Sequence, residues 1–133
     1  MCSGFLPVKD VYEKWVLMGE NYVSYVFPIL LLGFFGYRFL RGKQMKKLLP
    51  DLLKKGAVIV DVRSTAEFMG GSNPNSVNIP LDQLSAQSLG KFAKETPIVL
   101  CCASGMRSGM AVSTVKSFGY SNVVNAGPWT NTL

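Results

Sequence analysis

Residues 97–109 read Pro97-Ile-Val-Leu-Cys-Cys102-Ala-Ser-Gly-Met-Arg107-Ser-Gly, and this stretch decides the fold. Its apolar start predicts a buried strand over residues 98–101, and a helix is expected to begin near Arg107. Backbone N–H groups of the loop and of the open first helical turn would then converge on the Cys102 sulfur. With the Arg107 guanidinium, they predict a thiol pKa below the free value of about 8.5. The alternative is a buried structural cysteine.

The chain from residue 46 onward alternates strand and helix patterns. Strands are expected at residues 57–62, 77–80, 98–101 and 122–124, and helices at residues 48–55, 81–92 and 108–118. Ser64-Thr-Ala-Glu67 has the pattern of a capping box that opens a further short helix. This alternation predicts an α/β domain with a mostly parallel sheet flanked by helices.

Several motifs of this domain, in their order along the chain, resemble those of rhodanese-like sulfurtransferase domains. They are Val58-Ile-Val-Asp61-Val-Arg63, Glu67-Phe68, Gly71-Ser-Asn-Pro74-Asn-Ser-Val-Asn78-Ile-Pro80 and Cys102-Ala-Ser-Gly-Met-Arg107-Ser. The resemblance covers residues 47–129. One loop departs from the family pattern: Ser72 replaces the usual His, Asn75 the usual Gly and Ser76 the usual Ala. These departures concern the geometry of that turn and lie outside the cysteine loop.

The resemblance implies a rhodanese-like fold and a double displacement of sulfur. The Cys102 thiolate would take the outer sulfur of thiosulfate or a persulfide, and a thiol or cyanide would then remove it. Asp61 and Arg63 are expected to support the site by fixing the end of the central strand. The loop expected to bind the donor anion and stabilise the persulfide comprises Ala103, Ser104, Gly105, Met106, Arg107 and Ser108.

Composition narrows the chemistry further. The chain has no histidine, so no histidine general base exists, and an already ionised thiolate needs none. Three cysteines without a Cys-x-x-Cys pair predict no metal site, and no cofactor is implied. The net charge is +6, but from residue 48 onward seven basic residues face five acidic ones. We therefore expect no nucleic-acid binding by the domain.

Three other functions fit parts of the pattern. Counted from Cys101, Arg107 completes Cys-x5-Arg, the spacing of cysteine phosphatases. Against this, Gly105 stands three residues after Cys102 rather than after Cys101, which favours Cys102 as the nucleophile. The same fold could serve as a non-catalytic sulfur carrier or docking module. A vicinal Cys101–Cys102 disulfide ranks last because its ring is strained.

The N-terminal part predicts a single membrane span. Residues 22–37 contain no charged side chain, and Phe39-Leu40 extends the apolar run. Residues 22–40 at ~1.5 Å each would nearly cross a hydrocarbon core of ~30 Å. A buried core helix fits less well, because the remaining chain already accounts for a complete small domain. A cleaved signal peptide would need a basic region before the apolar run and an Ala-x-Ala site after it, and an interfacial helix would need a polar face, all of which are missing here.

The charge on either side of the span predicts its orientation. Basic residues follow it without an acid until Asp51, whereas no positive excess precedes it. The C-terminal domain is therefore expected in the cytoplasm and the N-terminus outside. The expected parts are an external segment at residues 1–20, a span in contact with lipid at 21–41, a basic linker at 42–47 and the rhodanese-like domain at 48–133. A homodimer through Gly33 and Gly36 of the span is a secondary expectation.

Overall fold

The structure, a computed structural model, describes residues 8–133. Residues 1–7 lie outside the described part, and the expected external position of Cys2 concerns one of them. The chain forms two units, Met1–Phe39 and Leu40–Leu133. A single helix, α1 (Val8–Lys54), contributes to both.

The helix α1 continues through residues 42–47, where the sequence predicted a linker. The helix expected at 48–55 is therefore the last part of α1 rather than a separate element. Residues 43–49 are Lys, Gln, Met and Leu, which all have high helix propensity, and they include no proline. Gly56, with φ +80°, follows the end of α1 and has the left-handed conformation typical of the residue after a helix C-terminus.

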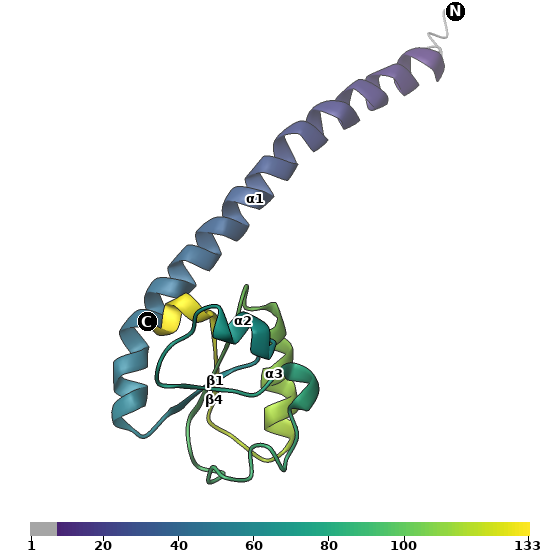
Figure 1. Cartoon of the computed structure of the whole chain (residues 1–133). Helices are drawn as coiled ribbons and strands as arrows, with labels where there is room; N and C mark the ends of the chain where they lie inside the picture. The colour runs from purple at the N-terminus through teal and green to yellow at the C-terminus, as the bar shows by residue number, and fades with distance from the viewer. Residues whose placement is uncertain (1–7) are drawn as a thin grey trace, which may run out of the picture. The chain divides into compact units, whose positions relative to one another are not determined.

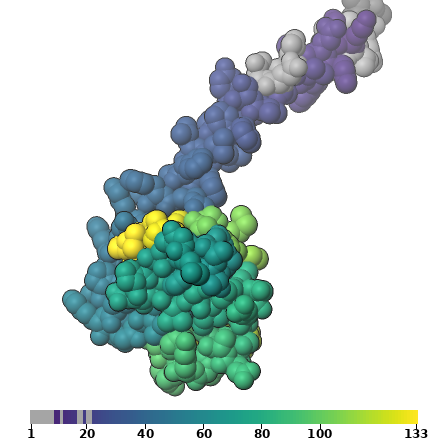
Figure 2. Space-filling model, in the orientation of Figure 1, coloured from purple at the N-terminus to yellow at the C-terminus, as the bar shows by residue number. Residues whose placement is uncertain are grey.

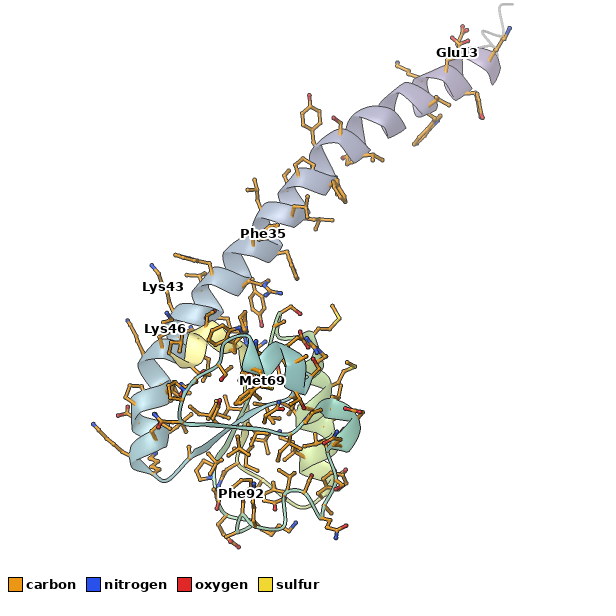
Figure 3. All side chains as sticks on the ribbon, viewed as in Figure 1. Glu13, Phe35, Lys43, Lys46, Met69 and Phe92 are labelled. Carbon is orange, nitrogen blue, oxygen red and sulfur yellow. The ribbon has the colours of Figure 1, made fainter. Side chains whose placement is uncertain are left out.

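The part of α1 between Tyr22 and Lys54 is long and apolar enough to cross a membrane. Its most apolar 18 residues have a mean hydropathy of 1.6, and none of this window is buried. Figure 3 labels Phe35 within the apolar stretch, and Lys43 and Lys46 where the basic residues follow it. By length and composition, α1 is a candidate anchor.

A four-stranded parallel sheet lies at the centre of the second unit, in the order β2-β1-β3-β4 (Figure 1). The strands are β1 (Val58–Asp61), β2 (Ser76–Asn78), β3 (Ile98–Cys102) and β4 (Val123–Pro128). The other elements are the helices α2 (Thr65–Met69) and α3 (Met106–Ser117) and the 3-10 turns η1 (Leu81–Gln83) and η2 (Trp129–Thr132). Every residue of β3 is buried, as expected for an inner strand covered on both faces.

Two hydrophobic clusters cover the two faces of the sheet. On one face, Ala111 and Val115 of α3 lie in the cluster that contains Cys102. On the other face, Met45 of α1 lies in the cluster that contains Cys101. In Figure 2, teal and green atoms from the middle of the chain cover the face of this unit turned toward the viewer. The end of β3 therefore carries two adjacent cysteines with different surroundings.

Several predicted boundaries differ from the structure by one to four residues. The strand β3 extends through Cys102 instead of ending at residue 101, and α3 begins at Met106 instead of residue 108. The strand β4 is longer than the expected 122–124 and reaches Pro128. The capping box is confirmed: the Ser64 and Glu67 side chains each accept from the backbone N–H of the other residue.

The helix expected over residues 81–92 is wrong, because only η1 is helical there. Backbone turns and side chains together satisfy the backbone of this segment. The Ser85 and Ser88 hydroxyls each accept from the backbone N–H of the other residue, at 3.1 and 2.9 Å. The Tyr120 hydroxyl lies 2.6 Å from the Leu89 carbonyl oxygen. Serine side chains that bond nearby backbone groups compete with a helix, which explains the irregular path.

Candidate active site

Cys102 ends β3, and the loop to α3 folds back over its sulfur. Gly105 N donates to Cys102 Sγ at 3.0 Å, and Ser108 Oγ lies 3.4 Å from the same sulfur. Cys102 and Ser108 are each 0% exposed. The sulfur thus sits among donors from the loop and the first turn of α3.

Opposing effects set the ionisation of Cys102. Burial raises the pKa of the thiol, because a thiolate loses hydration inside the protein. Hydrogen bonds from the Ser108 side chain and from the backbone N–H groups of Ser108, Gly105 and Ser104 outweigh this, so the pKa lies below its ordinary value. A thiolate is the reactive form of cysteine in displacement reactions.

A left-handed glycine makes the loop possible. Gly105 has φ +94°, a conformation that side chains with a Cβ rarely adopt. A Cβ on Gly105 would lie 3.0 Å from Gly127 Cα in β4. The loop therefore lies directly against the β4 backbone, and in this position the Gly105 N–H donates to the sulfur.

Arg107 lies beside the loop, but its guanidinium is paired with a carboxylate. Its Nη1 and Nη2 donate to the two oxygens of Glu67 at 2.8 and 2.7 Å. The Arg107 bonds, with those from Ser64, lower the pKa of Glu67 to about 2. The pair joins α2 to the start of α3, and its expected contact with a donor anion stays a prediction.

Asp61 and Arg63 form a second, buried pair at the end of β1. Arg63 Nη2 donates to Asp61 Oδ2 at 2.7 Å and to the Gly71 carbonyl oxygen at 2.8 Å. The Arg63 guanidinium also stacks over the Trp129 ring, 4.8 Å from its centroid. This pair thereby links the strand end to the loop before β2 and to η2.

Cys101 lies on the face of the sheet opposite Cys102. It is 1% exposed and packs with Met45, Ile59 and Ala126. Burial, with a smaller contribution from the Asp61 charge, raises the pKa of its thiol to about 12. Alternation along β3 thus separates the two adjacent thiols, and Cys101 stays protonated at neutral pH.

The other loop residues named from the sequence lie at the surface. Ala103 and Ser104 are exposed, and the Met106 residue is 75% exposed. Met69, at the end of α2 and labelled in Figure 3, is also exposed. Among the described residues, no group of three or more His, Cys, Asp or Glu side chains could hold a metal ion.

One residue that no sequence pattern indicated contacts this loop in several places. Asn125 in β4 reaches the Gly105 carbonyl oxygen, the Ser108 hydroxyl and the Gly127 N–H. No motif distinguishes Asn125 in the sequence, although the glycine and proline that follow it indicate an irregular strand end. The strand pairing is indeed irregular, with a register shift between Leu100 and Cys101.

Comparisons with known proteins agree with this geometry. The model of the Rhodanese-like domain family matches residues 45–126, more than half of the chain. A rhodanese domain-containing protein of Drosophila melanogaster is 38% identical over 85 residues, which cover 53% of this chain and 77% of that protein. The adenylyltransferase and sulfurtransferase uba4 of Ogataea parapolymorpha is 38% identical over 72 residues, 54% of this chain. This chain spans only 18% of the Ogataea protein.

A solved structure supports the same assignment. The human single-domain sulfurtransferase superposes with a TM-score of 0.52 at 28% identity, covering 62% of this chain and 87% of that chain. The parallel sheet flanked by helices and the cysteine loop between β3 and α3 match the fold that the sequence predicted. The chain belongs to the rhodanese-like domain family.

Proposed function

We propose that this protein is a membrane-anchored sulfurtransferase that carries sulfane sulfur as a Cys102 persulfide. The donor is thiosulfate or a persulfide, and the acceptor is a thiol or cyanide. The observation that carries the proposal is the position of Cys102 Sγ, 3.0 Å from Gly105 N and 3.4 Å from Ser108 Oγ. Donors placed around the sulfur in this way stabilise a thiolate and the negative charge that moves along a persulfide during transfer.

Transfer takes place in two displacements. The Cys102 thiolate attacks the outer sulfur of the donor, a new S–S bond forms, and the old bond breaks with its electron pair on the departing sulfite or thiolate. An acceptor thiolate or cyanide then attacks the outer sulfur of the persulfide, and Cys102 leaves as a thiolate. No net oxidation or proton transfer by the protein is required, which suits a chain without histidine.

The exposed part of the loop provides the approach for both substrates. Ala103, Ser104 and Met106 are exposed around the buried sulfur, so small movements of this loop bring a donor to Cys102. Arg107 supplies positive charge beside the loop, although Glu67 shares it. Asp61 and Arg63 hold the neighbouring strand end and are 0% and 5% exposed.

Mass spectrometry of the purified protein after exposure to thiosulfate tests this proposal. The peptide that contains Cys101 and Cys102 should gain one sulfur atom, fragmentation should place it on Cys102, and cyanide should remove it. Repeated release of thiocyanate would separate an enzyme from a sulfur carrier that reacts once. A sulfur atom on Cys101, or none on either cysteine, would contradict the proposal.

We also propose that residues 21–41 span the cell membrane once and contact its lipids. The apolar window in α1 and the basic residues that follow it support this arrangement, with the rhodanese-like domain in the cytoplasm. The cytoplasm is reducing, which keeps Cys102 available as a free thiol.

A further inference from the structure

The side chain of Asn125 has an orientation that its partners determine. Gly127 N–H can only donate, and it lies 2.8 Å from Asn125 Oδ1. The Gly105 carbonyl oxygen can only accept, and it lies 3.2 Å from Asn125 Nδ2. These two neighbours assign the oxygen and the nitrogen of the carboxamide. Asn125 Oδ1 is therefore an acceptor for both of its close contacts.

This orientation determines which neighbour accepts the hydrogen bond of the Ser108 hydroxyl. Ser108 Oγ lies 2.8 Å from Asn125 Oδ1 and must donate to it, because the carboxamide oxygen has no proton. A serine hydroxyl has one proton, so Ser108 cannot donate to Cys102 Sγ, 3.4 Å away, at the same time. In this arrangement the Cys102 thiol can donate to Ser108 Oγ.

Ionisation of Cys102 removes the thiol proton and creates a charged acceptor. The Ser108 hydroxyl can then rotate and donate to the sulfur, because hydrogen bonds to charged acceptors are the stronger ones. Asn125 Oδ1 is not left without a partner, since Gly127 N–H still donates to it. Apart from the proton that the Cys102 thiol loses, the thiol and thiolate arrangements differ only in the direction in which the Ser108 hydroxyl donates.

The charged groups nearest to Cys102 along the chain and in neighbouring elements are paired with groups of opposite charge. Arg107, on α3, is paired with Glu67 of α2 at 2.7 Å. Asp61, at the end of β1, is paired with Arg63 at 2.7 Å. The strand β4 carries no titratable side chain, and the other such group on β3 is Cys101, on the opposite face. Hydrogen bonds are thus the main adjustable influence on the Cys102 thiol.

We propose that Asn125 is a positioning residue that sets the ionisation of Cys102 through Ser108. Its Oδ1 accepts the hydrogen bond of the Ser108 hydroxyl while Cys102 is a thiol, and the hydroxyl, keeping its proton, turns to donate to Sγ when Cys102 becomes a thiolate. This inference rests on the proposed role of Cys102 as the sulfur-carrying thiol. Asn125 competes with the sulfur for the hydrogen bond of the Ser108 hydroxyl, so it restrains ionisation of the Cys102 thiol. Its Nδ2 also donates to the Gly105 carbonyl oxygen and so helps to shape the loop.

The test is the pH dependence of Cys102 alkylation by iodoacetamide in the full-length protein in detergent, measured on the Cys102 peptide by mass spectrometry. Asn125→Ala removes the competing acceptor and should move the midpoint to lower pH, with reaction about tenfold faster below the midpoint. Asn125→Asp strengthens the acceptor and should move the midpoint to higher pH. Both variants lose the hydrogen bond from Asn125 Nδ2 to the Gly105 carbonyl oxygen, so this loss cannot explain midpoint shifts in opposite directions.

Ser108→Ala provides the second arm. In that background Asn125→Ala should leave the midpoint unchanged, and Asn125→Asp should raise it less than it does beside Ser108. The proposal would be overturned if the alkylation midpoint moved in the same direction in both single variants. It would also be overturned if Asn125→Ala still moved the midpoint in the Ser108→Ala background. If Asn125→Ala does not fold, the Asn125→Asp comparison with and without Ser108 decides alone. No sulfur donor is present, so failure of sulfur transfer would not affect the result.

Discussion

At the scale of single residues, β3 places chemically similar side chains in different environments. Cys102 lies among donors from the loop and α3, whereas Cys101 packs against apolar side chains on the other face of the sheet. The pKa of Cys102 is lowered and that of Cys101 is raised to about 12, with burial the largest cause for Cys101. This difference supports the assignment of Cys102 as the nucleophile.

Replacement of each cysteine by serine tests this assignment. Cys102→Ser should abolish thiosulfate:cyanide sulfur transfer, because a hydroxyl does not ionise near neutral pH and cannot carry the sulfur. Cys101→Ser should keep most of the activity, since its side chain faces the opposite cluster. Thiocyanate formation measures the rates. The wild-type protein and both variants should be inert toward aryl phosphates, and hydrolysis that depends on Cys101 would indicate a phosphatase.

The proposed contribution of Arg107 can be measured at the same scale. Arg107→Ala should raise KM for thiosulfate about tenfold or more, the size expected for loss of one charge-assisted contact of ~1.5–3 kcal/mol. Glu67→Gln is the matched variant: it releases the guanidinium and should lower KM. If thiosulfate kinetics are unchanged in both variants, Arg107 acts only by joining α2 to α3.

At the scale of elements, the loop from Cys102 to α3 makes a close contact with β4. Gly105 (φ +94°) meets the Gly127 backbone, and Gly127 itself has φ +79°. Two glycines in the left-handed region thus allow the loop and the irregular strand end to approach one another. Neither the contact nor the register shift in β4 follows from local sequence patterns.

Gly105→Ala should destabilise the protein by more than Gly56→Ala. Gly56 also has a positive φ, +80°, but nothing lies within 4 Å of a Cβ there, so its variant has only the left-handed strain of ~1–2 kcal/mol. The Gly105 variant adds a contact 3.0 Å from Gly127 Cα. Thermal unfolding of the two variants gives the comparison. If both variants lost the same stability, the loop would be able to move away from β4 at no cost.

The link between α2 and α3 should make stability depend on acid pH. The pKa of Glu67 is lowered to about 2 from an ordinary value of 4.5, so the folded protein holds this carboxylate ionised better than the unfolded chain does. Its stabilisation is complete above about pH 4.5 and is lost as the pH falls toward 2. Unfolding midpoints of wild type and Glu67→Gln should therefore converge over this range. A constant difference between them would contradict the role of the pair.

At the scale of the whole molecule, the sequence predicted the class of the fold better than its details. The apolar strand, the glycine-containing loop and the capping box sufficed for the α/β class, because they depend on local pattern, and the role of Cys102 in that loop stays a prediction. The irregular segment after η1 could not be predicted, because part of its backbone bonds to the side chains of Ser85, Ser88 and the distant Tyr120. The role of Asn125 also depends on strands and helices that meet only in the folded domain.

The orientation in the membrane is a prediction for the intact chain. A membrane-impermeant thiol reagent applied to intact cells should label Cys2 and spare Cys102, because basic residues after a span favour a cytoplasmic position for the segment that follows. Permeabilised cells provide the control, in which Cys102 also reacts. Labelling of Cys102 in sealed cells would reverse the proposed orientation.

The pKa values of the two neighbouring thiols are shifted in opposite directions, so the two cysteines can serve as a pair of reporters. Cys102 becomes reactive through donors that exist only in the assembled loop, while Cys101 is protected by the packing of Met45, Ile59 and Ala126. Alkylation confined to Cys102 therefore marks a native molecule, and alkylation of Cys101 marks one that has opened. A single tryptic peptide would then report the reactivity of Cys102 and the folding of the domain together.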